Sequence, residues 1–141
     1  LQGAIGVDQL EKVDIIHEKR MKHKKMMQNI LLNRVKGIRI PDELEHAETS
    51  WFGVPIICKD KHQKAKLVNL LESNKIQTRN YFAGNILIHP AYKHLDDFKK
   101  YPNSNQVLDR VFFLGCPPHY TQDTFDYIDS VLKNETYNLW Y

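Results

Sequence analysis

The first third of the chain carries a helical repeat that is long for a globular protein. Between residue 1 and about residue 33, apolar side chains recur at steps of three and four, with Lys, Glu and Asp between them. The members of this repeat are Ile5, Leu10, Val13, Ile16, Met27, Ile30 and Leu31. A helix of about nine turns is more typical of a spine between domains than of a helix within one. We therefore predict a long inter-domain or interface helix over residues 1–33.

The start of this segment indicates whether the chain is a whole protein or part of a longer one. Residue 1 is Leu rather than Met, and no Ser, Thr, Asp or Asn precedes the helical pattern to cap it. We expect the chain to be the C-terminal part of a longer polypeptide. The small residues Gly3, Ala4 and Gly6 indicate close approach of another backbone. Tight packing within one subunit and a contact between two subunits both explain them.

Residues 34–133 alternate between strand-like and helix-like segments. Gly37 ends the long helical pattern, and strands are predicted at 38–40, 51–58, 76–82 and 111–114. Helices are predicted at 60–74, 103–110 and after 121, with Asp60, Asn103 and Thr121 as caps. The expected inward faces of the first and last of these helices are Ala65 or Lys66, Leu67, Leu70 and Leu71, and then Phe125, Ile128 and Leu132. The order predicts a small α/β (α+β) domain, a sheet of three or four strands covered by helices. The aromatic tail at 134–141 receives no assignment.

Composition excludes several classes of function. Hydrophobic residues make up 42% and charged residues 26% of the chain, as in an ordinary soluble domain. No leader and no membrane-spanning run is visible, so a cytoplasmic protein is expected. The net charge of +3 comes largely from the basic stretch at 19–25, which spreads around a helix and is interpreted as solvated surface rather than a nucleic-acid contact. Cys58 and Cys116 are expected to be reduced thiols, and no metal site is predicted.

No self-contained catalytic motif is present, and the histidines are scattered; His17 and His23 are expected at the surface. The segment 78–85, followed by His89 to Tyr92, resembles a binding site instead. Arg can bind a phosphate or carboxylate, Asn and His can hydrogen-bond hydroxyls, and Phe and Tyr can stack on a ring. This set suits a nucleotide sugar. The alternative is structural: Arg79 pairs with a nearby acid and Phe82 belongs to the core.

Several stretches in order are similar to one family, the DegT/DnrJ/EryC/StrS sugar aminotransferases, which are fold-type I pyridoxal-phosphate enzymes. The resemblance runs from residue 1 to about residue 132 and is carried by residues 1–14, 50–56 (SWFGVPI), 78–79, 82–85 (FAGN), 90–92, 102–103 and 109–115 (DRVFFLG). The combination is most similar to the branch of CDP-4-keto-6-deoxy-D-glucose 3-dehydrases that make lipopolysaccharide O-antigen sugars. It departs from that branch at Ile88-His89 and at 116–120.

The resemblance implies the chemistry of a complete enzyme. Such an enzyme removes the C3 hydroxyl of a nucleotide-linked 4-keto sugar with pyridoxamine phosphate, and a partner iron–sulfur flavoprotein supplies the reducing electrons. A histidine replaces the usual Schiff-base lysine. The base and the cofactor pocket belong to a large domain upstream of residue 1, so this chain is expected to bind no cofactor alone and to contribute no catalytic residue. By resemblance, Arg79, Phe82 and Asn85 line the substrate side of the cleft.

Two other functions stay open. The chain is also compatible with the same domain of a sugar aminotransferase, which transfers an amino group instead of removing a hydroxyl; the FAGN loop favours the dehydrase. The third possibility is a remnant or assembly module that only forms a homodimer through its first helix.

Overall fold

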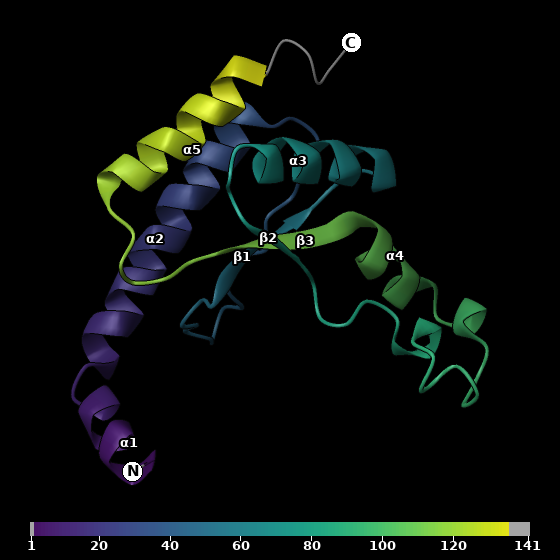
Figure 1. The fold of residues 1–141 in the computed structure, drawn as a ribbon, viewed down its shortest axis with the longest axis horizontal. Helices are drawn as coiled ribbons and strands as arrows, with labels where there is room; N and C mark the ends of the chain where they lie inside the picture. The colour runs from purple at the N-terminus through teal and green to yellow at the C-terminus, as the bar shows by residue number, and fades with distance from the viewer. Residues whose placement is uncertain (1, 136–141) are drawn as a thin grey trace.

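The computed structural model describes residues 2–135, and the tail from residue 136 onward lies outside the described residues. Helices α1 (Gln2–Leu10) and α2 (Val13–Arg34) come first, followed by β1 (Gly53–Ile57), α3 (Lys61–Ser73) and β2 (Thr78–Asn80). Two short 3₁₀ helices, η1 (Ile86–Ile88) and η2 (Phe98–Lys100), lead to α4 (Pro102–Arg110), β3 (Val111–Gly115) and α5 (Gln122–Glu135). The predicted α+β class is confirmed (Figure 1).

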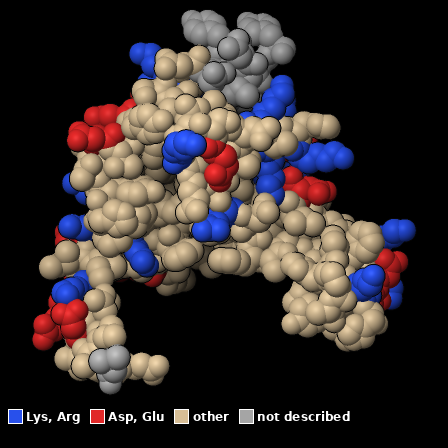
Figure 2. All heavy atoms as spheres, in the orientation of Figure 1, with Lys and Arg blue, Asp and Glu red and all other residues tan. Residues whose placement is uncertain are grey.

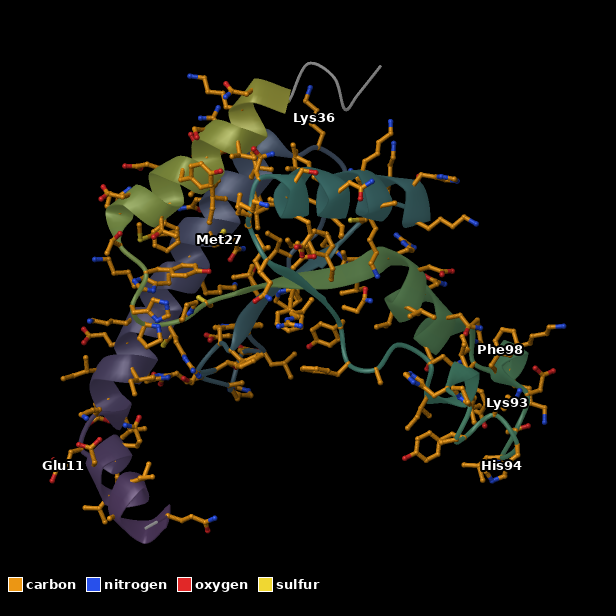
Figure 3. All side chains as sticks on the ribbon, viewed as in Figure 1. Glu11, Met27, Lys36, Lys93, His94 and Phe98 are labelled. Atoms are coloured by element: carbon orange, nitrogen blue, oxygen red, sulfur yellow. The ribbon has the colours of Figure 1, made fainter. Side chains whose placement is uncertain are left out.

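The predicted single helix over 1–33 is instead two helices. A turn at Glu11 and Lys12 separates them, and the Lys12 amide donates to Gln9 rather than continuing the helical ladder. Helix α1 buries none of its residues, so no packing holds it in line with α2. The apolar positions Ile5, Leu10 and Val13 of the predicted stripe are exposed, whereas Met27 and Leu31 of α2 enter the core (Figure 3).

The sheet has three antiparallel strands in the order β1-β3-β2. One face packs on α2, α3 and α5 and supplies Val54, Ile56, Phe112 and Leu114 to the core. Helices therefore cover one face of the sheet and leave the other open (Figure 1). The strand predicted at 38–40 is reduced to a single bridge between Arg39 and Ile57, because Gly37 and Pro41 leave only three residues for pairing.

The predicted helix beginning after Asp60 is confirmed. The Asp60 side chain accepts a hydrogen bond from the Gln63 amide at 2.8 Å, as in a capping box. Gln63 is buried and reaches the Lys59 amide and the Lys36 carbonyl. The predicted core positions Ala65 and Lys66 are wrong, because both are exposed.

Of the two later helices, α4 differs from expectation in its N-terminal cap, and α5 begins where predicted. Helix α4 begins at Pro102 after Tyr101, without a side-chain cap, so the predicted cap at Asn103 is wrong. Proline supplies the start instead, since its fixed φ suits the first helical turn. Helix α5 follows Thr121 as expected and buries Phe125, Ile128 and Leu132.

The molecule has the shape of an arch. Helices α1 and the first part of α2 form one leg; the segment 81–101, called the arm below, forms the other with α4 (Figure 1). Figure 2 shows the hollow between them, below the sheet. The labelled residues Lys93, His94 and Phe98 lie at the far end of the arm (Figure 3). None of the helices within residues 2–135 is both long enough and apolar enough to cross a bilayer.

Candidate functional site: the open face of the sheet

The open face of the sheet is defined by one row of three register partners. Pro55 of β1 lies opposite Phe113 of β3, which lies opposite Arg79 of β2. The neighbours of Pro55 and Phe113 along their strands are core residues, so the alternation of a β-strand places these two side chains on the face without helices. The register places Arg79 in the same row. This row is the centre of the candidate site.

Pro55 fits here because β1 lies at one edge of the three-stranded sheet. The Cys116 amide donates to the Phe52 carbonyl and the Cys58 amide to the Arg110 carbonyl, which sets the alternation of the β1–β3 ladder. Position 55 falls between the bonded pairs, where the backbone of β1 points away from β3. A missing N–H therefore costs no ladder bond.

Phe113 is covered by aromatic rings from two other segments. The ring centroids of Phe52 and Phe82 each lie 5.8 Å from that of Phe113, and that of Tyr81 lies at 6.2 Å. Phe113 is 5% exposed, while Phe52 and Phe82 are 64% and 77% exposed. The result is an aromatic platform, made of these four rings, with two of its faces available to a ligand.

Glycine is required at the edge of this platform. A Cβ on Gly53 would lie 2.4 Å from the Phe113 ring and 2.8 Å from the Leu114 carbonyl oxygen. Only a residue without a side chain lets the Phe113 ring lie against β1. The segments 50–56, 82–85 and 109–115 thus meet at one place in space.

Two cavities adjoin the platform and share Phe52, Phe82 and Phe113 as walls. The smaller, of about 280 Å³, runs along Thr49 to Gly53. The larger, of about 540 Å³, is lined also by Arg20, Gln77, Arg79, Gly115, Cys116, Pro117, His119 and Tyr120. Its polar lining groups are mainly cationic or neutral, and none is a carboxylate.

Arg79 is exposed and opens into the larger cavity. Within residues 2–135 it has no ion pair, although Glu72 is near enough for its charge to matter. The pKa of Glu72 is lowered mainly by hydrogen bonds from the Thr78 amide and hydroxyl, with Arg79 a smaller cause. The structural alternative for this segment placed Arg79 in an ion pair and Phe82 in the core. Instead, Arg79 forms no ion pair within the described residues, and Phe82 is exposed.

Asn85 occupies a different environment from Arg79 and Phe82. It is 3% exposed; its amide donates to the Phe98 carbonyl at 3.1 Å and to the Asn105 side chain at 2.8 Å, and its oxygen accepts from the Leu87 amide. These contacts tie the arm to α4. The structure brings Arg79 and Phe82 together and leaves Asn85 outside the two cavities, and its contact with substrate stays a prediction.

The turn before Asn85 also holds the arm in place. Gly84 has φ +67°, and a Cβ there would lie 2.7 Å from a methyl group of Leu108. Both the left-handed backbone and the contact with α4 demand glycine. The FAGN segment therefore combines an exposed ring at Phe82 with a fixed anchor at Asn85.

Two residues of α2 are not the surface groups that the sequence predicts. His23 is 7% exposed; its Nδ1 lies 2.9 Å from the Pro117 carbonyl oxygen, and its ring packs against Phe125. Lys24 of the basic stretch is 5% exposed and pairs with Asp42 at 2.7 Å. Both are buried because α2 packs against loops from distant parts of the chain, which periodicity alone does not reveal.

The cavity lining does not fit pyridoxal phosphate as a complete site. Enzymes that use this cofactor commonly hold it through a lysine Schiff base and a carboxylate or arginine at the ring nitrogen, and of these groups the larger cavity supplies arginine alone. The larger cavity contains neither lysine nor carboxylate. Its arginines and aromatic rings match an anionic ligand that carries a ring.

Four residues of the site escaped prediction as ligand-binding groups: Arg20, Phe52, Phe113 and His119. Phe52 and Phe113 lie in the family-like stretches. The presence of aromatic residues in separate motifs of one family was the signal that could have identified them as site residues. Arg20 lies within the basic stretch, where nothing local separates it from its solvated neighbours.

Comparison with known proteins identifies the class and then the family. The architecture is shared with sugar-processing enzymes: the structure of Escherichia coli GDP-4-keto-6-deoxy-D-mannose-3-dehydratase with bound hydrated pyridoxal phosphate superimposes with a TM-score of 0.76 at 26% identity, over 93% of this chain and 34% of that one. The chain belongs to the DegT/DnrJ/EryC1/StrS aminotransferase family, whose model matches residues 1–133.

Two curated relatives have similar levels of identity. The lipopolysaccharide biosynthesis protein RfbH of Salmonella typhimurium is 30% identical over 92% of this chain and 31% of its own length. The dTDP-4-dehydro-2,6-dideoxy-D-glucose 3-dehydratase of Saccharopolyspora spinosa is 33% identical over 91% of this chain and 28% of its own length. The chain thus spans about a third of the length of the relatives that it matches.

Proposed function

We propose that the chain is the C-terminal portion of a nucleotide-sugar 3-dehydratase that depends on pyridoxamine phosphate. The reaction is C3 deoxygenation of a CDP-linked 4-keto-6-deoxyhexose for lipopolysaccharide O-antigen synthesis. The observation that carries this proposal is the open cavity beside Phe113, where three separate family-like segments converge. Relatives named as 3-dehydratases support the reaction class.

In this proposal the open face of the sheet forms the substrate side of the active-site cleft. Arg79 donates hydrogen bonds to an anionic group of the nucleotide sugar, and the rings of Phe82 and Phe52 contact a flat part of it. Asn85 holds the arm that carries Phe82, or reaches the substrate when the arm rearranges. Together the rings also exclude water from the cleft.

The remaining components are supplied from outside the chain. A large domain provides the cofactor and the base, the chain alone is inactive, and an iron–sulfur flavoprotein delivers electrons in the cytoplasm. Residues 1–33 form an interface segment, residues 34–133 form the small domain, and two copies associate. The exposed apolar side chains of the first segment support an interface there: Ile5, Val7, Leu10, Val13 and Ile15.

A nucleotide-sugar aminotransferase is the second candidate. The family model itself is described by that activity, and in our proposal the base that separates the two reactions belongs to the large domain. Exposed Phe82 in a turn fixed by Gly84 and Asn85 is the feature of this chain that favours the dehydratase.

The test is turnover by the complete polypeptide in which this sequence occurs. It is incubated with a CDP-linked 4-keto-6-deoxyhexose, pyridoxamine phosphate and a chemical or enzymatic reductant, and the sugar product is identified by mass spectrometry. Loss of the C3 oxygen supports the proposal. A product that carries nitrogen with pyridoxal phosphate and glutamate makes the protein an aminotransferase, and absence of both products leaves an assembly module. The variants Arg79→Gln and Phe82→Ala should raise KM, whereas the exposed-site control Arg39→Gln should not.

A further inference from the structure

Among the described residues, Arg20 of α2 carries an unexplained polar atom. Its Nε is buried, and within residues 2–135 it has no hydrogen-bond partner. No carboxylate of the described chain lies within ion-pair distance of its guanidinium. A buried donor without an acceptor is costly, and native proteins rarely retain one without a reason. An acceptor from outside this part of the chain would satisfy this donor.

The position of Arg20 shows where such an acceptor would lie. Arg20 of α2 and Arg79 of β2 both line the larger cavity, and His119 lines the same space. Two arginines and one imidazole ring thus line a cavity of about 540 Å³ that has an aromatic wall and no acidic group. A cavity of this kind attracts a multiply charged anion, since each charge is stronger where water is partly excluded.

Two contacts hold the loop after β3 against α2 near Arg20. The Cys116 thiol donates to the Arg20 carbonyl at 3.3 Å, and His23, one turn further along α2, contacts the Pro117 carbonyl oxygen at 2.9 Å. These contacts hold the loop 116–120, which carries His119, against α2. The segments that carry Arg20 and His119 are therefore positioned before any ligand arrives, which reduces the entropic cost of binding.

We infer that Arg20, Arg79 and His119 form a phosphoryl-binding subsite whose ligand is the diphosphate of a nucleotide sugar. This inference rests on the proposed function for the identity of the ligand, but its geometry does not depend on which reaction follows. The planar guanidinium of Arg20 donates to phosphoryl oxygens from α2, and Arg79 does so from β2. The aromatic platform then receives a ring attached to the diphosphate. The phosphate of pyridoxal phosphate has the same chemistry and is the other source to be distinguished.

Binding to the 141-residue chain tests this inference directly. Calorimetric titrations at low salt use CDP, inorganic pyrophosphate and pyridoxal phosphate as probes. The chain is compared with the variants Arg20→Gln, Arg20→Lys and Arg79→Gln. Arg39→Gln is the matched control because the Arg39 side chain is exposed and only its backbone pairs with Ile57. Thermal unfolding of each variant shows that it is folded.

We expect CDP and pyrophosphate to bind, with affinity reduced about tenfold or more by Arg20→Gln and Arg79→Gln, partly restored in Arg20→Lys and unchanged in Arg39→Gln. If pyridoxal phosphate binds in an Arg20-dependent manner and CDP does not bind, the phosphoryl subsite is supported, but its ligand is the cofactor. Absence of binding by all three probes overturns the inference, as does binding that Arg20→Gln leaves unchanged. Arg20-dependent binding together with failed turnover of the complete enzyme would reject only the proposed reaction.

Discussion

The ring of Phe82 lies 5.8 Å from that of Phe113, and this contact joins the arm to the central strand of the sheet. Phe82 is 77% exposed and Phe113 is 5% exposed. Phe82→Ala should therefore change the free energy of unfolding by less than about 0.5 kcal/mol, while Phe113→Ala should lower it by about 3 kcal/mol. Urea unfolding of both variants measures the difference. Equal losses would show that the platform is a second core rather than a binding surface.

The requirement for glycine at position 53 gives a second prediction. Gly53→Ala places a Cβ 2.4 Å from the Phe113 ring and 2.8 Å from a backbone oxygen, so either β1 or the ring must move. We expect a loss of about 1–3 kcal/mol in the free energy of unfolding. Gly6→Ala is the matched control, because nothing lies within 4 Å of its Cβ position and alanine favours the helix. An unchanged midpoint for Gly53→Ala would contradict the close contact.

Local patterns predicted the elements of the small domain well. Asp60 and Gln63 cap α3 as their spacing indicates, and Phe125, Ile128 and Leu132 form the inward face of α5. The predictions failed where contacts between distant segments determine the course of a helix or the burial of a side chain. Helix α1 buries nothing, so its periodicity did not ensure a straight continuation into α2, and His23 is buried by a loop almost a hundred residues away.

The candidate site was predictable only in part. Arg79 and Phe82 are close in sequence and share a cavity. Arg20 comes from a distant segment and had no local signal, whereas Phe52 and Phe113 lie in family-like stretches whose meeting in space only the structure reveals. Asn85 has the residue type of a ligand-binding group, yet its hydrogen bonds are made within the chain.

Asn85 should act as the anchor of the arm. Asn85→Ala removes the bonds to Phe98 and Asn105 and leaves the Leu87 amide without its acceptor. We expect amide hydrogen exchange to accelerate across residues 86–98 and the free energy of unfolding to fall by about 1–3 kcal/mol. Asn69→Ala, on the exposed side of α3, provides the comparison. Unaltered exchange in the arm, combined with weaker binding of CDP, would instead place Asn85 in direct contact with substrate.

Both thiols should be unreactive in the folded protein. Burial raises the pKa of Cys58 and of Cys116 to about 11, although nearby Lys64 and Arg20 respectively act in the opposite direction. Since the thiolate is the nucleophile, alkylation at pH 8 should be much slower than for a free cysteine. Mass spectrometry after iodoacetamide treatment should find neither cysteine modified in buffer and both modified in guanidinium chloride. Rapid modification of Cys116 alone would show that the loop 116–120 opens readily.

The arm should loosen in acid because of Asp96. Hydrogen bonds from Lys100, from the Asp97 amide and from the Tyr101 hydroxyl lower the pKa of Asp96 to about 2, from an ordinary value of 3.8. A folded-state pKa below the unfolded value means that the charged form stabilises the fold. Its contribution is complete above pH 4 or so and is lost as the pH falls through about 2. Hydrogen exchange in the arm, corrected for the intrinsic pH dependence, should accelerate over that interval. Asp96→Asn should abolish this dependence, whereas Asp123→Asn, in the first turn of α5, should preserve it. A carboxyl carbon signal of Asp96 that titrates near 4 would show that these hydrogen bonds do not hold the charge in solution.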